Sequence, residues 1–394
     1  METDNAWVSI KDMNQREILC TAEQITDAGV ANSNVKLQPL GTILLSFKLT
    51  IGRVALAGRP LYTNEAIAGL RPRKILPEYL YHGLQQWNLL QDVDQAIKGA
   101  TLNKAKLERI EFTLPESKVE QEMIAGILSL IERGIEQTEA LVAKQHRVNA
   151  GLTHDLLSRG TDSGGVLRSE DTHEFKDSPL GRIPAEWAVR TLEDMTPRNA
   201  PIGYGIVQPG DFDHSGVPVA GIYTINTNFE QWHKSSRRIE SAYSRSRIQP
   251  GDVLLSIKGT TGRVGVVPAG MAGNISREVA RIRPLDSINP KYLRYLMLSD
   301  FFQRYLANAE VGTTRAELSI KNLRQLVAVV PQRDEQDEIV SRLASLERDW
   351  SKAQEQLAKY RAIRTALMQD LLTGRKRVTP LLDEVAEPAS QQRA

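Results

Sequence analysis

Residues 115–128, PESKVEQEMIAGIL, open a stretch that returns later in the chain as residues 331–343, PQRDEQDEIVSRL. Glu120 corresponds to Glu335, an offset of 215 residues that holds from the Glu-Gln pair onward. In each copy apolar residues recur at steps of four and three for about five heptads, without a proline. This spacing predicts one long helix per copy, with an apolar seam of the kind found in left-handed coiled coils.

The seam of each copy ends in a Leu-Leu pair. At about 1.5 Å per residue, a helix of roughly 40 residues is about 60 Å long, which suits a spacer better than a core element. Two unrelated amphipathic helices are the alternative, but the resemblance of the copies extends beyond the seam. The predicted seam residues are Ile124, Leu128, Ile131, Ile135, Val142, Leu152, Leu156, Ile339, Leu343, Leu346, Trp350, Leu357, Tyr360, Leu367 and Leu371.

Composition places the chain among ordinary globular proteins. Its 394 residues favour two or three domains, and 41% of them are hydrophobic and 25% charged. We expect a cytoplasmic protein, because no apolar run approaches the length of a membrane span and the residues after Met1 lack the form of a signal peptide. A single cysteine, Cys20, excludes an internal disulfide framework and any cysteine-based metal cluster.

The net charge of +2 is unevenly distributed. Residues 1–114 carry 13 Lys and Arg against 12 Asp and Glu, whereas residues 180–330 carry 19 against 13. An excess of positive charge in one globular segment suits a polyanionic ligand, although a solvated basic surface is the commoner explanation.

The two segments that precede the predicted helices are globular. We predict domains at 1–114 and 180–330, long helices at 115–159 and 331–373, a Gly-, Ser- and Asp-rich linker at 160–179 and a tail at 374–394. The first segment has a mixed pattern, with strands expected at 7–10, 42–47, 54–57 and 110–114 and helices at 77–90 and 103–109.

The second globular segment repeats the first. Residues 40–54, LGTILLSFKLTIGRV, match residues 250–264, PGDVLLSIKGTTGRV, at a constant offset of 210. The chain is therefore a tandem duplication of a globular domain followed by a long helix. We predict an α+β fold in which two mixed α/β domains, related by a pseudo-twofold axis, are separated by two long antiparallel coiled-coil helices.

Three further motifs accompany this duplicated order. They are Ile183-Pro184-Ala185-Glu186-Trp187, Gly251-Asp252-Val253-Leu254-Leu255-Ser256 and Gln369-Asp370-Leu371-Leu372-Thr373-Gly374. With them, nearly the whole chain resembles the specificity (S) subunit of type I restriction-modification systems.

The resemblance implies a function and a set of partners. Each globular domain would be a target recognition domain that reads one half of a bipartite sequence in double-stranded DNA. The helices would be spacers and docking surfaces for two methyltransferase (M) subunits, and the complex would include two restriction (R) subunits where DNA is cleaved. S-adenosylmethionine, ATP and magnesium would then belong to the partners, with no cofactor in this chain.

The first repeat departs from the second at its start. About 40 residues precede the strand expected at 219–222, whereas only residues 1–6 precede its counterpart at 7–10. We therefore expect the first domain to be shortened at its N-terminus, without counterparts of Trp187 and Leu192.

Catalytic motifs are missing from the sequence. It contains no Asn-Pro-Pro-Tyr or Asp-Pro-Pro-Tyr methyltransferase motif and no His-Glu-x-x-His zinc motif. Residues 259–263, GTTGR, lack the Gly-Lys-Ser/Thr ending of a phosphate-binding loop. We predict a binding protein with no catalytic residues and no metal site.

Three regions carry the residues that we expect to contact DNA. Cations can neutralise phosphates or reach guanine edges, and threonine hydroxyls can bond phosphates. The alternatives are tight turns whose glycines serve only the backbone, and plain polar surface loops. The candidates are Lys48, Thr50, Arg53, Lys258, Thr260, Thr261 and Arg263 in the duplicated loop, Trp232, Lys234, Arg237, Arg238, Arg245 and Arg247 in a stretch peculiar to the second repeat, and Thr314 and Arg315.

Other functions remain open from the sequence alone. The chain could be a truncated or silent specificity allele without activity, which the short first domain favours. It could also be the recognition region split from a fused restriction-methylation enzyme. A purely structural coiled-coil scaffold is a third alternative, and its DNA affinity would not steepen at low salt.

Overall fold

The computed structural model describes residues 5–48, 50–87, 107, 110–111, 114–226, 231–309 and 317–379. The chain divides into two compact units, each with a globular domain and segments of both long helices. Unit one comprises Met1–Leu141 and Ala353–Ala394, and unit two comprises Val142–Lys352. The helix predicted at 103–109 and the strand predicted at 110–114 fall largely outside the described residues.

The domain of unit one combines two small sheets with helix α2. A three-stranded sheet has the order β3-β1-β6 and a four-stranded sheet the order β2-β5-β4-β7. The elements are β1 Ala6–Val8, η1 Ile10–Asp12, β2 Glu17–Ile18, β3 Glu23–Gln24, α1 Asp27–Ala31, β4 Ile43–Ser46, β5 Val54–Ala57, β6 Tyr62–Thr63, β7 Ile67–Leu70 and α2 Pro77–Gln86.

The domain of unit two has the same two sheets and further elements around them. Its three-stranded sheet has the order β13-β12-β16 and its four-stranded sheet the order β11-β17-β14-β15. The elements are β8 Phe175–Ser178, β9 Gly181–Pro184, β10 Ala188–Thr191, β11 Gly203–Tyr204, β12 Val217–Ala220, β13 His233–Ser235, α5 Arg237–Ser241, η3 Ser244–Ser246, β14 Val253–Ser256, β15 Val264–Val266, β16 Asn274–Ile275, β17 Val279–Ile282, α6 Pro290–Leu298, α7 Asp300–Asn308, α8 Ile320–Gln325 and β18 Val327–Val330.

Strand register confirms the duplication. Trp7 pairs in parallel with Tyr62 in β1·β6, and Val219 pairs in parallel with Asn274 in β12·β16. Both members of the second pair lie 212 residues after those of the first. The antiparallel sets β5-β4-β7 and β15-β14-β17 correspond in the same way, and the additional strands β2 and β11 lie on opposite edges of them.

The central strands place alternate side chains in separate cores. Leu44 of β4 belongs to one apolar cluster, and Ile43 and Leu45 belong to another that packs against α2. In β14, Leu254 and Leu255 likewise enter different clusters. This alternation follows from the two-residue period of a strand and fixes which side of the duplicated hairpin faces each core.

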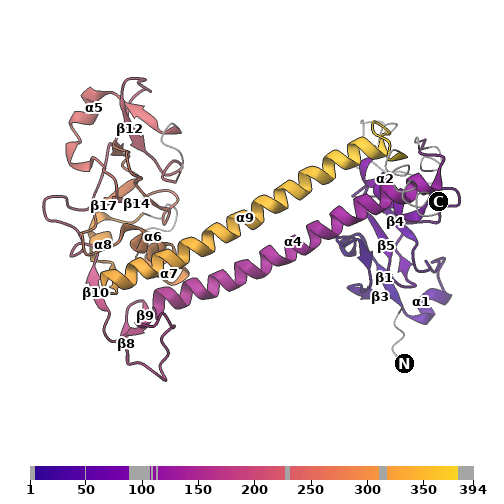
Figure 1. The fold of residues 1–394 in the computed structure, drawn as a ribbon, viewed down its shortest axis with the longest axis horizontal. Coiled ribbons are helices and arrows are strands. Elements are labelled where there is room, and N and C mark those ends of the chain that lie inside the picture. The colour runs from indigo at the N-terminus through magenta and orange to yellow at the C-terminus, as the bar shows by residue number, and fades with distance from the viewer. Residues whose placement is uncertain are drawn as a thin grey trace, which may run out of the picture. The chain divides into compact units, whose positions relative to one another are not determined.

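The two long helices are α4, Lys118–Ser158, and α9, Arg333–Leu372. Each is one uninterrupted ribbon in Figure 1. Both end before a glycine in the left-handed region, Gly160 with φ +62° and Gly374 with φ +71°, as expected for a residue that follows a helix C-terminus. The predicted ranges of 115–159 and 331–373 therefore agree with the observed bounds to within a few residues.

The helices run antiparallel within each unit. In unit one Glu132 contacts Arg364 and Glu139 contacts Arg361. Residue numbers therefore increase along α4 in the direction in which they decrease along α9. In unit two the side chain of Asn149 donates to the carbonyl of Leu346.

None of the predicted seam residues is exposed. Seven of them are buried and the other eight are half-buried; the buried ones are Ile124, Leu128, Leu156, Ile339, Leu343, Leu357 and Leu371. Ile124, Leu128 and Leu371 share an apolar cluster with Tyr79 of α2, and Leu156, Ile339 and Leu343 join the main core of unit two. The seam is therefore anchored in the core of a globular domain at both of its ends.

A glutamine near the start of each long helix fastens the helix to its globular domain. In unit one the Gln121 side chain donates to Pro115 O at 2.7 Å and accepts from Leu76 N at 3.0 Å. In unit two Gln336 donates to Pro331 O at 2.9 Å and accepts from Asn289 N at 2.8 Å. Both amides are buried, which explains why the Glu-Gln motif is duplicated together with its proline.

Gln336→Ala is expected to destabilise unit two by about 1–3 kcal/mol, because it leaves the Asn289 N–H and the Pro331 carbonyl without a partner in a buried site. The exposed Gln332, one turn earlier, is the matched control, and Gln332→Ala should change stability by less than about 0.5 kcal/mol. Urea unfolding of the two variants measures the difference. Equal losses of stability in the two variants would show that the hydrogen bonds of Gln336 do not stabilise unit two.

The glutamate of each motif pairs with an arginine that follows the other long helix. Glu120 accepts from Arg377 Nε at 2.6 Å and Nη2 at 2.7 Å in unit one. The hydrogen bonds from Arg377 hold the pKa of Glu120 below its usual range. In unit two Glu335 accepts from Arg168 at 2.5 Å and from the Trp187 indole at 3.1 Å.

Part of this second pairing comes from the segment predicted as a linker, 160–179. Thr161 and Arg168 of this segment are buried, and the segment ends in β8, the first strand of the β8–β9 hairpin. The contact with Glu335 is the physical reason, since this half-buried carboxylate accepts hydrogen bonds from Arg168 and from Thr161 N.

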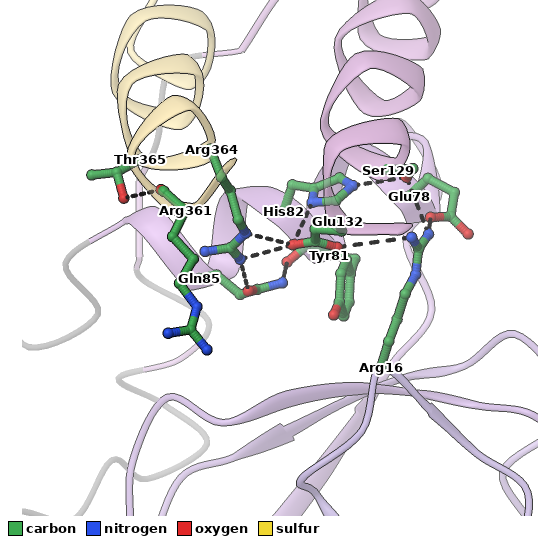
Figure 2. Close-up of polar contacts among 10 residues, drawn as sticks. All are labelled: Arg16, Glu78, Tyr81, His82, Gln85, Ser129, Glu132, Arg361, Arg364 and Thr365. Carbon is green, nitrogen blue, oxygen red and sulfur yellow. Dashed lines mark hydrogen bonds and ion pairs between the residues drawn. The ribbon is translucent and has the colours of Figure 1, made fainter. Parts of the chain in front are cut away.

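A second ion cluster of unit one joins three helices, α2, α4 and α9, to Arg16 in the bend before β2 (Figure 2). Glu132 of α4 accepts two hydrogen bonds from Arg364 of α9, at 2.9 and 2.7 Å. Its carboxylate also lies 3.6 Å from Nδ1 of the fully buried His82 of α2 and 3.8 Å from Arg16. Arg16 in turn pairs with Glu78 and donates to Ser129 at 3.2 Å. The cluster ties the first globular domain to both long helices.

Candidate nucleic-acid interface

The duplicated loop has the same hydrogen bonds in both units. The Ser46 hydroxyl accepts from Arg53 N at 2.9 Å, and the Ser256 hydroxyl accepts from Arg263 N at 2.8 Å. Buried serines thus fix the backbone of both arginines at the end of the hairpin. The hydroxyl of Ser46 also donates to the carbonyl of Thr50.

The loop glycines serve the backbone. Gly52 has φ +92° and Gly262 has φ +84°, a region that side chains with a Cβ rarely adopt. The carbonyl of Gly262 also accepts from the Gln303 side chain at 3.0 Å, and a Cβ on Gly262 would collide with that side chain. The positive φ angles give the glycines a role in the backbone, and this role does not depend on whether the neighbouring cations contact DNA.

The two arginines that follow these glycines are presented differently. The Arg53 guanidinium donates to Ile10 O at 3.1 Å and to Asn14 Oδ1 at 2.7 Å, so its Nη1 group is engaged within its own domain. Arg263 is exposed, with its guanidinium carbon 5.4 Å from the ring centre of Tyr223. Equivalent positions therefore have different surroundings in the two domains.

The remaining loop candidates also differ. Lys258 pairs with Glu317 at 2.7 Å, whereas Lys48 lies 5.7 Å from the ring centre of Phe47. Thr50 and Thr260 are exposed, and Thr261 is half-buried. The pairing of Lys258 reduces the positive charge that this side of the loop presents to a ligand.

The stretch at 231–247 is held to the second domain by a buried carboxylate. Glu240 accepts from Arg247 at 2.6 and 2.8 Å and from the Asn274 amide at 3.0 Å. The hydrogen bond from Arg247 is the chief cause that holds the pKa of Glu240 below its usual range. Arg247, predicted as a DNA contact, is thus committed to a structural ion pair although it lies at the surface.

Trp232 corrects another prediction. Its side chain is 3% exposed and packs in the core with Ile225, Leu254 and Val267. The ring cannot stack on a base without leaving that core, so we withdraw it as a DNA contact. The sequence pattern of an aromatic residue among cations did not distinguish a core ring from a surface ring.

Several cations of this stretch remain at the surface. Arg237 and Arg238 open helix α5, where Ser236 caps the first turn, and Arg245 lies in η3. All three are exposed, and within the described ranges none has an ion-pair partner. Lys234 of β13 is half-buried. Thr314 and Arg315 lie outside the described residues.

Two exposed aromatic residues of the second domain were not predicted from the sequence. Tyr223 is 73% exposed and Phe212 is 50% exposed. The Phe212 ring packs edge-on against His214, with ring centres 4.9 Å apart. Arg277, Arg294 and Arg348 were also not singled out, and the last two line a cleft of about 520 Å³ against α9. A single sequence does not reveal which aromatic residue of a turn points outward.

Metal sites and membrane spans are two further features that the described residues do not form. No group of three or more His, Cys, Asp or Glu side chains there is arranged to hold a metal ion. No helix in that part of the chain is long and apolar enough to cross a membrane.

Comparison with known proteins gives consistent matches. The family model of the type I restriction modification DNA specificity domain matches residues 1–144 and 184–359. The specificity subunit of the type I restriction enzyme EcoBI of Escherichia coli is 26% identical over 299 residues, which cover 73% of this chain and 62% of that relative. The MjaIX specificity subunit of Methanocaldococcus jannaschii is 23% identical over 401 residues, covering 96% of this chain and 88% of the relative.

Solved structures share the fold at low sequence identity. The HsdS subunit from Thermoanaerobacter tengcongensis aligns with a TM-score of 0.50 at 18% identity, covering 94% of this chain and 91% of that one. The S subunit of a type I restriction-modification system from M. genitalium aligns with a TM-score of 0.54 at 14% identity, covering 94% and 92%. The predicted mixed α/β fold with two long helices is confirmed.

Proposed function

Because this chain belongs to the family of the type I restriction modification DNA specificity domain, we propose that it recognises a bipartite DNA site, with each globular domain reading one half. The observation that carries the proposal is the duplicated hairpin loop. Its backbone hydrogen bonds are the same in both domains, but its arginine has different neighbours in each. Arg53 is engaged by Ile10 and Asn14, and Arg263 lies over Tyr223. Two similar platforms with different side chains suit two different half-sites.

The recognition would combine two physical contributions. Surface cations such as Arg237, Arg238 and Arg245 would neutralise phosphates and supply salt-dependent affinity without sequence preference. Side chains at the end of the duplicated hairpin would add base readout in the major groove. The long helices, anchored in the domain cores, would keep the distance between half-sites constant.

We further propose that the reactions occur in partner subunits. By family membership these would be two methyltransferase subunits that use S-adenosylmethionine and, in a restricting complex, two R subunits that use ATP and magnesium. Apolar side chains on the long helices support a docking role, since Leu130 and Leu141 of α4 are 66% and 56% exposed. This chain would then supply recognition and assembly without catalytic groups.

Modified-base sequencing tests the proposal. DNA is sequenced from cells that express this chain together with the methyltransferase subunit of the same system. We expect methylation in a split motif, with two short defined halves around a fixed unspecified gap. Methylation without any sequence preference would overturn the proposal. So would a complete lack of methylation when the same methyltransferase is active with another specificity subunit.

One observation favours a second candidate, a specificity chain in which only the second domain reads DNA. The Arg53 guanidinium of the first domain is engaged by Ile10 O and Asn14 Oδ1, whereas the equivalent Arg263 of the second domain is exposed. A single half-motif or its palindrome in the sequencing experiment would support this candidate. A complete lack of methylation, with the partner active beside another specificity subunit, would instead indicate a silent allele.

Arg237→Ala is expected to weaken DNA binding uniformly across sequences and to lower the salt slope by about one, because a phosphate contact carries no sequence information. Binding of labelled duplexes to the assembled complex between low and moderate salt measures the slope. Arg182→Ala is the control, since Arg182 is an exposed arginine that pairs with Glu170 away from the hairpin loop. An unchanged slope for Arg237→Ala would remove this residue from the interface.

A further inference from the structure

We propose that Tyr223 and Arg263 form a preassembled contact to a guanine in the half-site of the second domain, with Tyr223 as the positioning residue and Arg263 as the reading residue. The inference rests on the proposed function and deepens it. Its first support is geometric, because the Arg263 guanidinium carbon lies 5.4 Å from the centre of the Tyr223 ring. Such cation–π contacts occur within about 6 Å and favour arginine.

The backbone below the arginine is fixed. Arg263 N donates to the buried Ser256 hydroxyl at 2.8 Å, and Ser256 N donates to Arg263 O at 2.9 Å. The next residue, Val264, is fully buried at the start of β15. The side chain therefore projects from a rigid base, so little backbone entropy is lost when it contacts a ligand.

The backbone below the tyrosine is fixed as well. Ile222 and Ile225, on either side of it, are 8% and 5% exposed, and Gly221 N donates to the Thr224 hydroxyl at 2.9 Å. Tyr223 is nevertheless 73% exposed. The turn thus buries its aliphatic residues and presents its aromatic residue to solvent, next to the cation.

The charge of Arg263 is available to a ligand. Within the described ranges no carboxylate pairs with its guanidinium, whereas Lys258 in the same loop is neutralised by Glu317. A guanidinium that contacts a ring through its π face keeps the N–H donors in its own plane available for hydrogen bonds. Two such donors match guanine O6 and N7, the commonest specific arginine contact in the major groove.

The first domain provides an internal comparison. Arg53 occupies the equivalent position, but its guanidinium donates to Ile10 O and Asn14 Oδ1. At the 212-residue offset of the strand pairs, the counterpart of Tyr223 is Lys11, which cannot supply a ring. The Tyr223–Arg263 pair is therefore a property of the second domain and would contribute to the readout of one half-site only.

The test uses the assembled complex of full chain and methyltransferase. Its binding to duplexes that carry each single base change in the split motif is measured for wild type, Arg263→Ala, Tyr223→Leu, Tyr223→Phe and Arg53→Ala. Arg263→Ala is expected to lose discrimination by about tenfold or more at one G·C pair of one half-site. Tyr223→Leu should reduce discrimination at the same pair, and Tyr223→Phe should retain it because the ring remains. Arg53→Ala should leave that pair unaffected.

Each contrary result has a distinct meaning. An equal loss of affinity for all duplexes in Arg263→Ala would show a phosphate contact and overturn the base contact. Full discrimination in Tyr223→Leu would overturn the positioning role. A wild-type complex that binds every duplex equally would overturn the proposed function, whereas a wild-type split motif that Arg263→Ala leaves unchanged would overturn only this pair. Thermal unfolding of each variant checks that the substitutions, including that of the half-buried Arg53, leave the fold intact.

Discussion

Glu335→Ala is expected to lower the free energy of unfolding of unit two by about 3–5 kcal/mol, the cost of removing one partner of a buried ion pair. The Arg168 side chain is only 8% exposed and the Glu335 side chain 13% exposed. The substitution also removes the acceptor of the Trp187 indole, at 3.1 Å, and of Thr161 N, at 3.0 Å. Arg168 would keep its contact with the more exposed Glu186, which cannot replace the other two bonds.

Glu338→Ala is the matched control for this substitution. Glu338 lies one turn further along α9 and pairs with Arg342 at 2.6 Å, but both side chains are more than a third exposed. An exposed pair of this kind contributes at most about 1 kcal/mol. Urea unfolding, followed by hydrogen exchange in peptides from residues 142–352, should separate the two variants. Similar losses would contradict the structural role of the duplicated glutamate.

Glu132→Gln is expected to destabilise unit one by about 2–3 kcal/mol at neutral pH, because the amide keeps the shape of the side chain but leaves nearby cations without their counter-charge. The Glu132 side chain is 10% exposed and Arg364 is 28% exposed, so part of the cost is screened by solvent. The affected neighbours in Figure 2 are Arg364, Arg16 and the buried His82.

The effect of Glu132→Gln should depend on pH. Burial raises the pKa of Glu132, but the nearby His82 and the Arg364 guanidinium outweigh burial and bring it below the ordinary value of 4.5. A carboxyl group whose pKa is lower in the folded state stabilises the fold above its unfolded pKa, and this contribution is lost as the pH falls through the folded pKa. The difference between wild type and variant should therefore be full above pH 4.5 and shrink below it.

The control for Glu132→Gln is Glu139→Gln, two turns along the same helix. Glu139 pairs with Arg361 of α9 at 2.6 Å, but the side chains are 44% and 61% exposed. Its loss should stay within about 1 kcal/mol. Urea unfolding of unit one at several pH values measures both variants. A loss for Glu132→Gln that is constant down to pH 3, or equal to that of the control, would contradict this account of the cluster.

The architecture could be predicted from the sequence because the pattern of a globular domain followed by a long helix occurs twice. The offset of 210 residues between the hairpin loops and the 3.5-residue period of the helices are local patterns, and each copy supports the interpretation of the other. Strand register follows from the same local patterns. The helix ends follow from the glycines after them, Gly160 and Gly374. The ion pairs of Glu120 and Glu335 could not be predicted, because their partners follow the other long helix and are distant in sequence.

The candidate interface was predicted less well than the fold. Burial decides which cations and aromatic residues meet a ligand, and burial depends on tertiary packing. Trp232 fills a core and Arg247 serves Glu240, although both lie in a stretch with the composition of a nucleic-acid interface. Tyr223 belongs to a turn whose neighbours Ile222 and Ile225 are buried, and only the folded chain shows that its ring points outward.

Exchange of the second domain tests the central claim, that each repeat reads one half of a split site, most directly. Residues 184–330 are replaced by the corresponding residues of a family member with a different target, and the methylated motif is determined by modified-base sequencing in the same cells. The duplication predicts that one half of the motif changes, while the other half and the length of the gap stay the same. A change in both halves, or an unchanged motif, would contradict a chain in which each repeat reads its own half-site.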